Sequence, residues 1–338
     1  MLAAVFSSTR NITVRDYCLR PLEKSELLIK VAYCGVCGTD RHIYEGNASS
    51  SLPVILGHEY SGVITDKGSK DAKFDIGNKV VVDPNIYCGY CRYCRIGKIN
   101  FCENLKALGV TLNGGFAEYS IVPVSQAYRV PNDFDLRIAT FAEPLSCCLR
   151  GIEHAGISPG NSVVIIGGGT IGLLMVQLVK NAGASRIILI EPDPHKQKLG
   201  IELGADYYFS SIEEGIFEKI NELTDSQVDV AIECVGNKDT VDQAIKLAGK
   251  GGKIVIFGLA PKDQHITLNL QHLFQNELKI FNSFLNPFTI KPAIDLLTQN
   301  RIKVQKLITK QICLKDINNF FHNNGFAHNI KVLIINNN

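Results

Sequence analysis

A glycine-rich turn follows an apolar segment in the middle of this chain. Residues 163–172 read V-V-I-I-G-G-G-T-I-G, and three of the glycines have the G-x-G-x-x-G spacing. Such glycines permit a tight turn and let backbone N–H groups approach a pyrophosphate, while the following helix directs its positive end at the same charge. The segment therefore predicts a dinucleotide-binding loop, against a packing turn in some other α/β protein. Its predicted cofactor-binding residues are Gly167, Gly169, Thr170, Ile171 and Gly172.

A carboxylate follows this loop at the distance that ribose recognition requires. Glu191 lies nineteen residues after Gly172, at the end of the next predicted strand, where it can bind both adenosine ribose hydroxyls. A carboxylate there repels a 2′-phosphate, so we expect NAD rather than NADP. Lys196 leaves NADP as the alternative, because it can pair with a phosphate or simply reach over the adenosine.

Strand-like and helix-like patterns alternate from about residue 160 onward. This alternation is typical of a doubly wound parallel sheet, and six strands fit one nucleotide-binding domain. The predicted strands are 162–166, 186–190, 205–209, 228–234, 253–257 and 278–281. The predicted helices between them are 172–182, 195–203 and 239–248. The apolar run 162–179 is a poor membrane span because four glycines interrupt it.

The first 145 residues have a different texture, with short alternating strands and many turns, such as 26–31, 78–82 and 117–123. After Pro287 the pattern predicts a helix at 290–299, a strand-like stretch at 302–312, another helix and a last strand at 331–335. This tail is too short to bury a core alone, so we expect it to complete the first domain. The predicted domains are 1–147 completed by 286–338, and 148–285.

Length and charge limit the function classes. The 338 residues suggest about two domains, and the net charge of +2 argues against a strongly basic nucleic-acid binder. The start, M-L-A-A-V-F-S-S-T-R, lacks the basic segment of a signal peptide. Eleven cysteines in so long a chain are more typical of metal ligands than of a secreted disulfide scaffold. We therefore expect a cytoplasmic protein with no membrane or nucleic-acid partner.

Four cysteines crowd into one loop with the spacing C-x2-C-x2-C-x7-C. They are Cys88, Cys91, Cys94 and Cys102. Four thiolates can close a tetrahedral zinc site with no open position, which predicts a structural zinc. The alternatives are four metal-free thiols or an iron–sulfur cluster, although nothing else indicates electron transfer. Arg92, Arg95 and Lys98 make the loop basic, and we interpret this as a solvated face rather than a nucleic-acid-binding zinc ribbon.

A second set of zinc-ligand residue types is dispersed along the chain. Cys37 lies in C-G-V-C-G-T-D-R-H, His58 and Glu59 lie in G-H-E, and Glu143 lies in F-A-E-P just before the nucleotide-binding domain. Three protein ligands leave a coordination position for water or substrate. Each residue has an ordinary alternative, such as a core histidine or a surface carboxylate, and spacing alone does not show that they converge.

These motifs follow one another along the chain in the order found in the zinc-dependent medium-chain dehydrogenase/reductase family. The chain resembles the polyol and threonine dehydrogenase branch of that family. The resemblance rests on C-G-T-D at 37–40, G-H-E-Y at 57–60, the four-cysteine loop, F-A-E-P-L at 141–145 and the 167–172 loop, and it covers essentially the whole chain. It implies a GroES-like catalytic domain joined to a Rossmann domain. It also implies two zinc ions per subunit, one catalytic and one structural, and a homodimer or homotetramer.

The resemblance places Cys37, His58 and Glu59 around the catalytic zinc. Glu143 matches the carboxylate that binds this zinc directly or holds its water. Thr39 and His42 match a proton relay in which a hydroxyl hands a proton to an imidazole, although Thr39 has the alternative of capping a helix. We interpret Cys34, Cys147 and Cys148 as core thiols.

The implied reaction is oxidation of a secondary alcohol to a ketone, with zinc as Lewis acid and hydride transfer to the nicotinamide. We rank a sugar alcohol or vicinal diol first as substrate, L-threonine second and simple secondary alcohols third. The Arg-Tyr pair of sorbitol dehydrogenases is missing from residues 281–287, and Asn286 there either binds a hydroxyl or merely precedes a turn. The alternative of another class is a cofactor-binding relative without catalysis.

Overall fold

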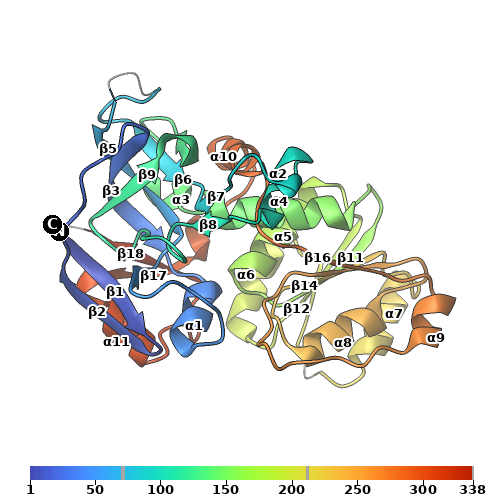
Figure 1. Cartoon of the computed structure of the whole chain (residues 1–338). Helices are drawn as coiled ribbons and strands as arrows, with labels where there is room; N and C mark the ends of the chain where they lie inside the picture. Colours follow the sequence, from blue (N-terminus) through green and yellow to red (C-terminus); the bar gives the residue numbers. More distant parts are fainter. Residues whose placement is uncertain (70–72, 211–212, 337–338) are drawn as a thin grey trace. The chain divides into compact units, whose positions relative to one another are not determined.

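The computed structural model describes residues 1–69, 73–210 and 213–336. The chain forms two compact units, each with its own buried core. Unit 1 comprises Met1–Ser146, Asn286–Asn300 and Val304–Asn338, and unit 2 comprises Cys147–Leu285 and Arg301–Lys303. The N-terminal and C-terminal segments of the chain thus belong to the same unit, and Figure 1 shows its first strands in blue and its last elements in red. Whether each unit is an independent domain with the predicted boundaries stays a prediction.

Unit 1 is built mainly from antiparallel sheet. Its largest sheet has the order β10-β6-β5-β3-β18-β17, with β9 also paired to β3, and a smaller sheet has the order β2-β1-β4. The last strand of the chain, β18, lies between β3 and β17, so the C-terminal segment completes a sheet begun by residues 26–35. This pairing carries the C-terminal segment to the strand that ends beside Cys37.

The elements of unit 1 are mostly short. Its strands are β1 (Leu2–Ser8), β2 (Asn11–Asp16), β3 (Glu26–Gly35), β4 (Val54–Ile55), β5 (Glu59–Lys67), β6 (Lys79–Val82), β7 (Asn85–Ile86), β8 (Lys106–Ala107), β9 (Tyr119–Pro123), β10 (Ala127–Arg129), β17 (Ile308–Cys313) and β18 (Lys331–Ile335). Its helices are α1 (Gly38–Glu45), α2 (Arg92–Arg95), α3 (Leu136–Ala139), α10 (Ile290–Thr298) and α11 (Ile317–His322), and α4 (Ala142–Ala155) begins in this unit.

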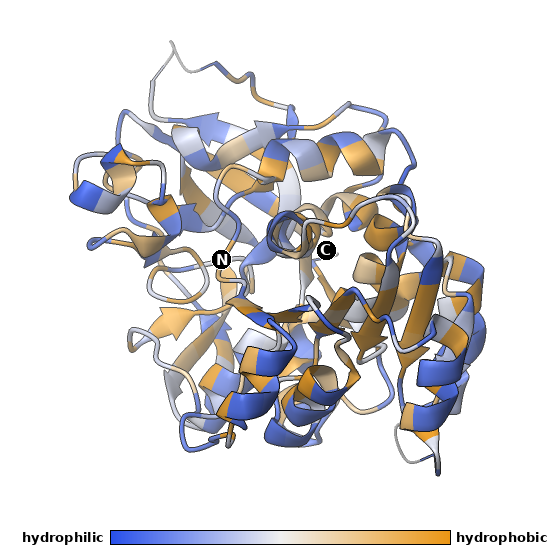
Figure 2. Ribbon diagram, turned by 90° about the vertical axis from the view of Figure 1, so that its right-hand side faces the viewer, coloured by the Kyte–Doolittle hydropathy of each residue, from blue (hydrophilic) through white to orange (hydrophobic). Residues whose placement is uncertain are grey.

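Unit 2 contains one parallel six-stranded sheet with the order β13-β12-β11-β14-β15-β16. The order reverses direction between β11 and β14, where ligands bind in doubly wound folds, at the carboxyl ends of the strands. Strands β11 and β12 are almost wholly buried, which explains why their sequences are continuous apolar runs. Figure 2 shows these parallel strands mostly in orange, whereas the helices carry blue and orange on different faces.

The elements of unit 2 alternate as the sequence predicts. The strands are β11 (Ser162–Ile166), β12 (Arg186–Ile190), β13 (Tyr207–Phe209), β14 (Val230–Glu233), β15 (Lys253–Ile256) and β16 (Lys279–Asn282). The helices are α5 (Thr170–Asn181), α6 (Gln197–Leu203), α7 (Ile216–Thr224), α8 (Lys238–Leu247) and α9 (Leu270–Gln275). The predicted doubly wound parallel sheet is confirmed.

Several predicted boundaries differ from the structure for local reasons. The predicted helix 195–203 begins as a 3-10 turn over Pro194–Lys196, because Asp193 accepts from His195 N and proline occupies the first turn. The stretch 302–312 becomes a strand only at Ile308, after a 3-10 turn over Gln305–Leu307. Helices α7 and α9 were not among the predicted helices, and in α9 the exposed Leu270 and Phe274 break the amphipathic pattern. Within the described residues no helix is long and apolar enough to cross a membrane.

Candidate functional site

Three predicted ligand residues converge in unit 1. The Cys37 sulfur, a His58 ring nitrogen and a Glu59 carboxylate oxygen all lie within 4.8 Å of one another. His58 and Glu59 are buried, and Cys37 is partly exposed. Thiolate, imidazole and carboxylate are the ligand types that zinc takes in catalytic sites with three protein ligands. The donor set therefore fits a zinc ion with room for a further ligand.

Glycines allow His58 to reach this position. Gly57 has a φ of 89°, in the left-handed region, and a Cβ there would lie 2.4 Å from Phe116 Cδ1. Gly109 and Gly114 pack against the same turn, since a Cβ on either would lie 2.2 Å from the Gly57 carbonyl oxygen. The tight backbone packing fixes where β5 begins, and with it His58 and Glu59.

Cys37 is positioned by the start of a helix. It is the N-cap of α1, and its backbone N–H donates to Asp40 Oδ2 over 2.8 Å. The other Asp40 oxygen, Oδ1, lies 3.5 Å from His58 Nδ1, and Asp40 is 0% exposed. A carboxylate on Nδ1 orients the ring and leaves Nε2 for a metal, which is a common arrangement around zinc. No role was predicted for Asp40, although its position three residues after the predicted ligand Cys37, at the start of a helix, was an available signal.

The His58 ring responds to these neighbours. Burial alone would lower the pKa of His58, but the negative charges of Asp40 and Cys37 outweigh it and raise this pKa well above its usual value. A metal cation supplies the same compensation for those charges. Among the described residues, Asp40 Oδ1 and His58 Nδ1 are buried 3.5 Å apart, and neither has a hydrogen-bond partner.

Glu59 has a cationic partner that sequence analysis missed. Lys331 Nζ donates to Glu59 Oε2 over 2.5 Å and also lies 3.3 Å from the Val36 carbonyl oxygen. Burial would lower the pKa of Lys331, but Glu59 outweighs it and the pKa is raised. Gly35 leaves space for this carboxylate, because a Cβ there would lie 2.2 Å from Glu59 Oε2. No local pattern could have shown this pair, since 272 residues separate its members.

Glu143 lies outside the group of three ligand atoms. It is the second residue of α4 and is 7% exposed, and its charge contributes to the raised pKa of Lys331. The Ser146 hydroxyl donates to the Glu143 carbonyl over 2.6 Å and in turn accepts from Asn286 Nδ2 over 2.8 Å. Asn286 is 2% exposed and also accepts from Asn85 Nδ2, so its side chain belongs to the interior. The geometry therefore favours a structural role for Asn286, before the turn, over binding of a substrate hydroxyl.

The two predicted relay residues are both on α1. Thr39 and His42 are three residues apart, which places them on the same helix face, and both are partly exposed. Partial burial lowers the pKa of His42. The ring is therefore neutral near pH 7 and able to accept a proton.

The four-cysteine loop also closes on itself. The sulfurs of Cys88, Cys91, Cys94 and Cys102 all lie within 4.8 Å of one another. Backbone N–H groups point at these sulfurs, as in Cys91 N to Cys88 Sγ at 3.4 Å and Cys88 N to Cys102 Sγ at 3.3 Å. Desolvation raises the pKa of Cys88, but hydrogen bonds from the Tyr90 and Cys91 N–H groups and from the Cys102 and Cys91 thiols lower it to about 6. Desolvation and the neighbouring thiols raise the pKa of Cys94 to about 12. The loop thus favours a thiolate at Cys88, and its donor set fits a closed zinc site.

The loop residues of unit 2 form a cradle after β11. Gly167 has a φ of 101°, and a Cβ on Gly172 would lie 1.7 Å from the Gly167 carbonyl oxygen. Gly169 is the N-cap of α5, which begins at Thr170 and Ile171. Glu191 Oε2 accepts from Gly168 N over 2.6 Å, and Lys196 Nζ lies 3.5 Å from Glu191 Oε1. The predicted cofactor residues thus share one end of the sheet.

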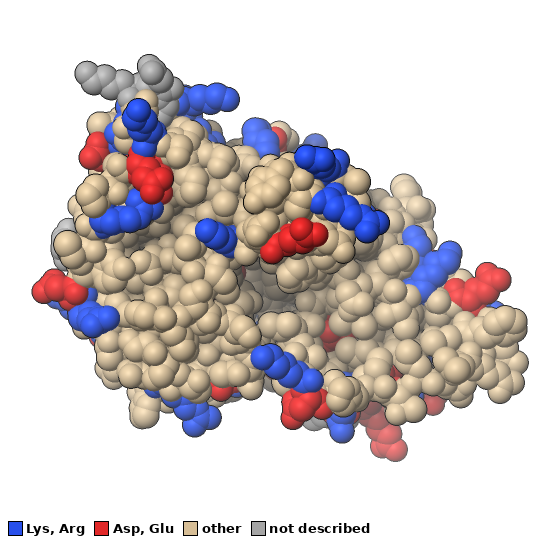
Figure 3. Space-filling view, in the orientation of Figure 1, with Lys and Arg blue, Asp and Glu red and all other residues tan. Residues whose placement is uncertain are grey.

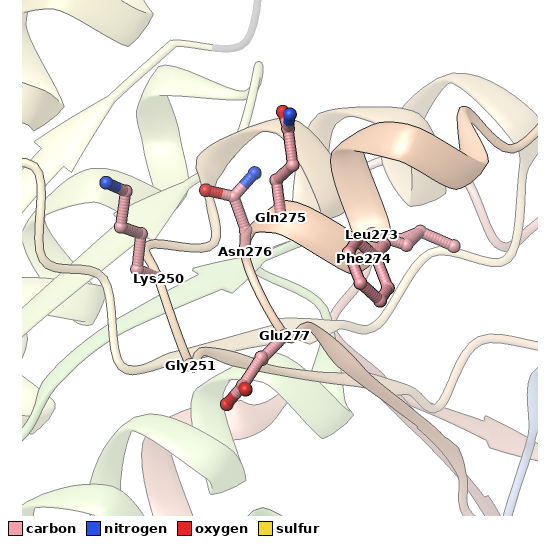
Figure 4. Close-up of a pocket in the computed structure, with 7 residues that line it drawn as sticks. All are labelled: Lys250, Gly251, Leu273, Phe274, Gln275, Asn276 and Glu277. Atoms are coloured by element: carbon pink, nitrogen blue, oxygen red, sulfur yellow. The ribbon is translucent and has the colours of Figure 1, made fainter.

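One surface hollow lies away from these residues. It has a volume of about 530 Å³ and is lined by Lys250, Gly251 and residues 273–277 (Figure 4). Lys250 and Glu277 precede β15 and β16, so the hollow lies at the amino ends of the strands. Ligands of doubly wound sheets bind at the opposite, carboxyl ends. We therefore do not take this hollow as the cofactor site.

Comparison with known proteins shows the family of this chain. Residues 23–132 match the model of the alcohol dehydrogenase GroES-like domain, and residues 170–299 match that of the zinc-binding dehydrogenase. The chain belongs to the zinc-dependent medium-chain dehydrogenase/reductase family. This medium-chain dehydrogenase is therefore an oxidoreductase that uses zinc and a nicotinamide cofactor, with the predicted GroES-like and Rossmann folds.

Similar members of the family differ in their named substrates. Sorbitol dehydrogenase of Halalkalibacterium halodurans is 35% identical over 92% of each chain. L-threonine 3-dehydrogenase of Pyrococcus abyssi is 35% identical over 74% of this chain and 73% of its own. A putative zinc-binding dehydrogenase from Sinorhizobium meliloti 1021, solved with NADP, is 39% identical with a TM-score of 0.96, covering 99% of this chain and 98% of that one.

Proposed function

We propose that this medium-chain dehydrogenase oxidises a secondary hydroxyl of a sugar alcohol or vicinal diol to the ketone, with NAD as the hydride acceptor. The observation that carries the proposal is the convergence of Cys37, His58 and Glu59. A zinc ion held by these residues supplies Lewis acidity, which lowers the pKa of a bound hydroxyl. We propose Glu143 as the carboxylate that binds this zinc directly or holds its water.

The chain's own residues hold the ligands and move the proton. Asp40 orients His58 so that Nε2 remains the ligand atom. Lys331 compensates the negative charge of Glu59. The hydroxyl of Thr39 accepts the substrate proton and hands it to the neutral imidazole of His42, which releases it to water. The lowered pKa of His42 supports this direction, because a neutral ring has a free lone pair.

The cofactor half of the proposal rests on the glycine loop and Glu191. The residues Gly167, Gly169, Thr170, Ile171 and Gly172 receive the pyrophosphate, and Glu191 receives the adenosine ribose hydroxyls. Glu191 is 6% exposed and already accepts N–H groups from Gly168 and Asp193, so its charge is fixed in place. Lys196 lies on this carboxylate, which favours the view that its charge offsets Glu191 rather than binding a 2′-phosphate.

The substrate ranking rests on coverage as well as identity. The sorbitol dehydrogenase relative matches along 92% of this chain, whereas the threonine dehydrogenase relative matches along 74%. L-Threonine is the second candidate, and simple secondary alcohols are the third. The missing Arg-Tyr pair at 281–287 leaves pentitols and diols as well as hexitols to be tested.

The test is NAD reduction by the zinc-loaded enzyme across pentitols, hexitols, their phosphates, vicinal diols and L-threonine. We expect a marked preference for one polyol or diol, lost on zinc removal. Cys37→Ser and His58→Ala should abolish turnover while NADH still binds, and Cys18→Ser, at an exposed cysteine outside both sites, is the matched control. Activity on L-threonine alone, or undiminished turnover by either site variant, would overturn the proposal.

Three further properties belong to the same proposal. We propose two zinc ions per subunit, the second closed by Cys88, Cys91, Cys94 and Cys102, so that Cys94→Ser retains one zinc by elemental analysis. We propose a homodimer or homotetramer, to be measured by light scattering. A cytoplasmic location is supported by the eleven cysteines, none of which forms a disulfide. On the face shown in Figure 3, basic and acidic side chains are interspersed, which supports a small-molecule rather than a nucleic-acid partner.

A further inference from the structure

A second turn lies beside the glycine loop at the point where the strand order reverses. Strand β14 pairs in parallel with β11, with Glu233 opposite Ile166, and Cys234 N donates to the Ile166 carbonyl over 2.8 Å. Both strands therefore end at the same level. The chain after β14, residues 234–237, faces the glycine loop that follows β11.

This turn is held by one buried carboxylate. Glu233 is 0% exposed, and its Oε1 accepts from Val235 N at 2.7 Å, from Gly236 N at 2.8 Å and from the Thr240 hydroxyl at 2.8 Å. Three donors from the turn and from the first helical turn of α8 thus meet on a single oxygen. Among the described residues, Oε2 is buried without a hydrogen-bond partner. Such a group is costly to bury, so its retention calls for an explanation.

Close packing on two sides also restricts the conformation of the 234–236 turn. A Cβ on Gly167 would lie 2.7 Å from Val235 Cγ2, so Val235 rests directly on the glycine loop. On the other side, a Cβ on Gly236 would lie 2.6 Å from the Leu259 carbonyl oxygen. Val235 is nevertheless 46% exposed, so the turn forms part of the open end of the sheet rather than of its core.

We propose that Glu233 is a positioning residue for the nicotinamide cofactor. By gathering the N–H groups of Val235 and Gly236 and the Thr240 hydroxyl, it sets the distance between the 234–236 turn and the 167–172 loop. It also satisfies two N–H groups that would otherwise form a second anion-binding turn, and so leaves the glycine loop as the place for the pyrophosphate. This inference rests on the proposed role of that loop in cofactor binding.

Substitutions at Glu233 and Thr240 can separate the role of the hydrogen bonds from that of the carboxylate charge. A glutamine keeps an Oε1 that can accept all three donors, and its amide nitrogen takes the place of the unpartnered Oε2. An alanine removes the acceptor for all three. Thr240→Val removes a single donor with little change in shape, so its effect should lie between those of the other two.

The experiment is a titration of the zinc-loaded full chain with NADH, followed by nicotinamide fluorescence. The chain has no tryptophan, which leaves the cofactor signal undisturbed. We expect Glu233→Ala to raise the Kd for NADH at least about tenfold and Glu233→Gln to stay within about threefold of the wild type. In Glu233→Ala, the KM for NAD should rise, whereas kcat at saturating cofactor should stay nearly unchanged. Glu277→Gln, an exposed change at the amino ends of the strands, is the matched control.

Each outcome decides the question. An unchanged Kd for Glu233→Ala, or a Glu233→Gln variant as weak as the alanine variant, would overturn the inference. If the alanine variant does not fold, the comparison of Glu233→Gln with Thr240→Val decides in the same way, because a purely structural role would alter melting temperature without altering Kd. Failure of the wild type to bind NADH would instead reject the proposed function.

Discussion

Lys331 and Glu59 form a buried ion pair between the last strand of the chain and the start of β5. Nζ and Oε2 are 2.5 Å apart, and the two side chains are 4% and 2% exposed. A buried carboxylate that we propose as a metal ligand must have its charge compensated whether or not the metal is bound. Strand β18 therefore supplies Glu59 with a counter-charge that does not depend on a bound metal.

Breaking this pair should destabilise the metal-free protein. Lys331→Met leaves the Glu59 charge buried without its partner, so we expect the free energy of unfolding to fall by about 3–5 kcal/mol. The double variant Lys331→Met with Glu59→Gln should recover much of that loss, because no uncompensated charge remains. Denaturant unfolding followed by circular dichroism measures both, since the chain lacks tryptophan. Losses that simply add in the double variant would show that the two groups are not coupled.

Asp40 should act on zinc affinity through His58. In Asp40→Asn, the orientation whose oxygen accepts from the Cys37 N–H turns the amide nitrogen toward His58 Nδ1, and the carboxylate charge is lost. We expect zinc affinity to fall about 10–100-fold. Competition with a chromophoric chelator measures this directly. Glu45→Gln, on the same helix, is the control and should leave zinc affinity unchanged.

The fold was predictable where local pattern and topology agree. Apolar runs such as residues 163–166 identified the buried parallel strands, because in such strands both faces are covered. Residue spacing predicted the glycine loop and the four-cysteine loop, because in each loop the residues that act together are close in the sequence. Helix α9 escaped prediction because its exposed Leu270 and Phe274 obscure the polar face.

The convergence of Cys37, His58 and Glu59 was harder to predict from the sequence. These residues come from a helix cap and the beginning of a strand about twenty residues later, and only a family resemblance suggested that Cys37, His58 and Glu59 meet. Lys331 and Gly35 carry no local signal at all. Their importance depends on β18 and β5 both pairing with β3, which is a property of the sheet rather than of any motif.

Glu191 should set the choice between NAD and NADP. Its carboxylate is fixed by Gly168 N at 2.6 Å and Asp193 N at 3.1 Å, where a 2′-phosphate would meet its negative charge. Glu191→Ala should weaken NADH binding and improve NADPH binding, lowering the NADH preference at least about tenfold. Parallel titrations with both reduced cofactors measure the ratio. Glu218→Gln, an exposed change on α7, should leave the ratio unaltered, and an unaltered ratio in Glu191→Ala would remove the ribose role.

Asp83 should make stability depend on pH. The carboxyl is 9% exposed, and burial raises its pKa from 3.8 to about 6, despite hydrogen bonds from Asn85 and Asn286 that lower it. The folded state therefore holds the proton more tightly than the unfolded state does. The resulting stabilisation is complete below about pH 4 and is lost as the pH rises through about 6, a change of about 3 kcal/mol.

Replacing this carboxyl by an amide should remove that pH dependence. Asp83→Asn keeps an oxygen for the Asn85 N–H and carries no charge at any pH. The difference in unfolding free energy between variant and wild type should therefore shift in favour of the variant by about 3 kcal/mol between pH 4 and pH 8. Denaturant unfolding at several pH values measures this difference, and Asp75→Asn, at an exposed position in the same unit, is the control. A difference that stays constant with pH would mean that Asp83 titrates alike in the folded and unfolded chain, in which case its burial would carry no electrostatic cost.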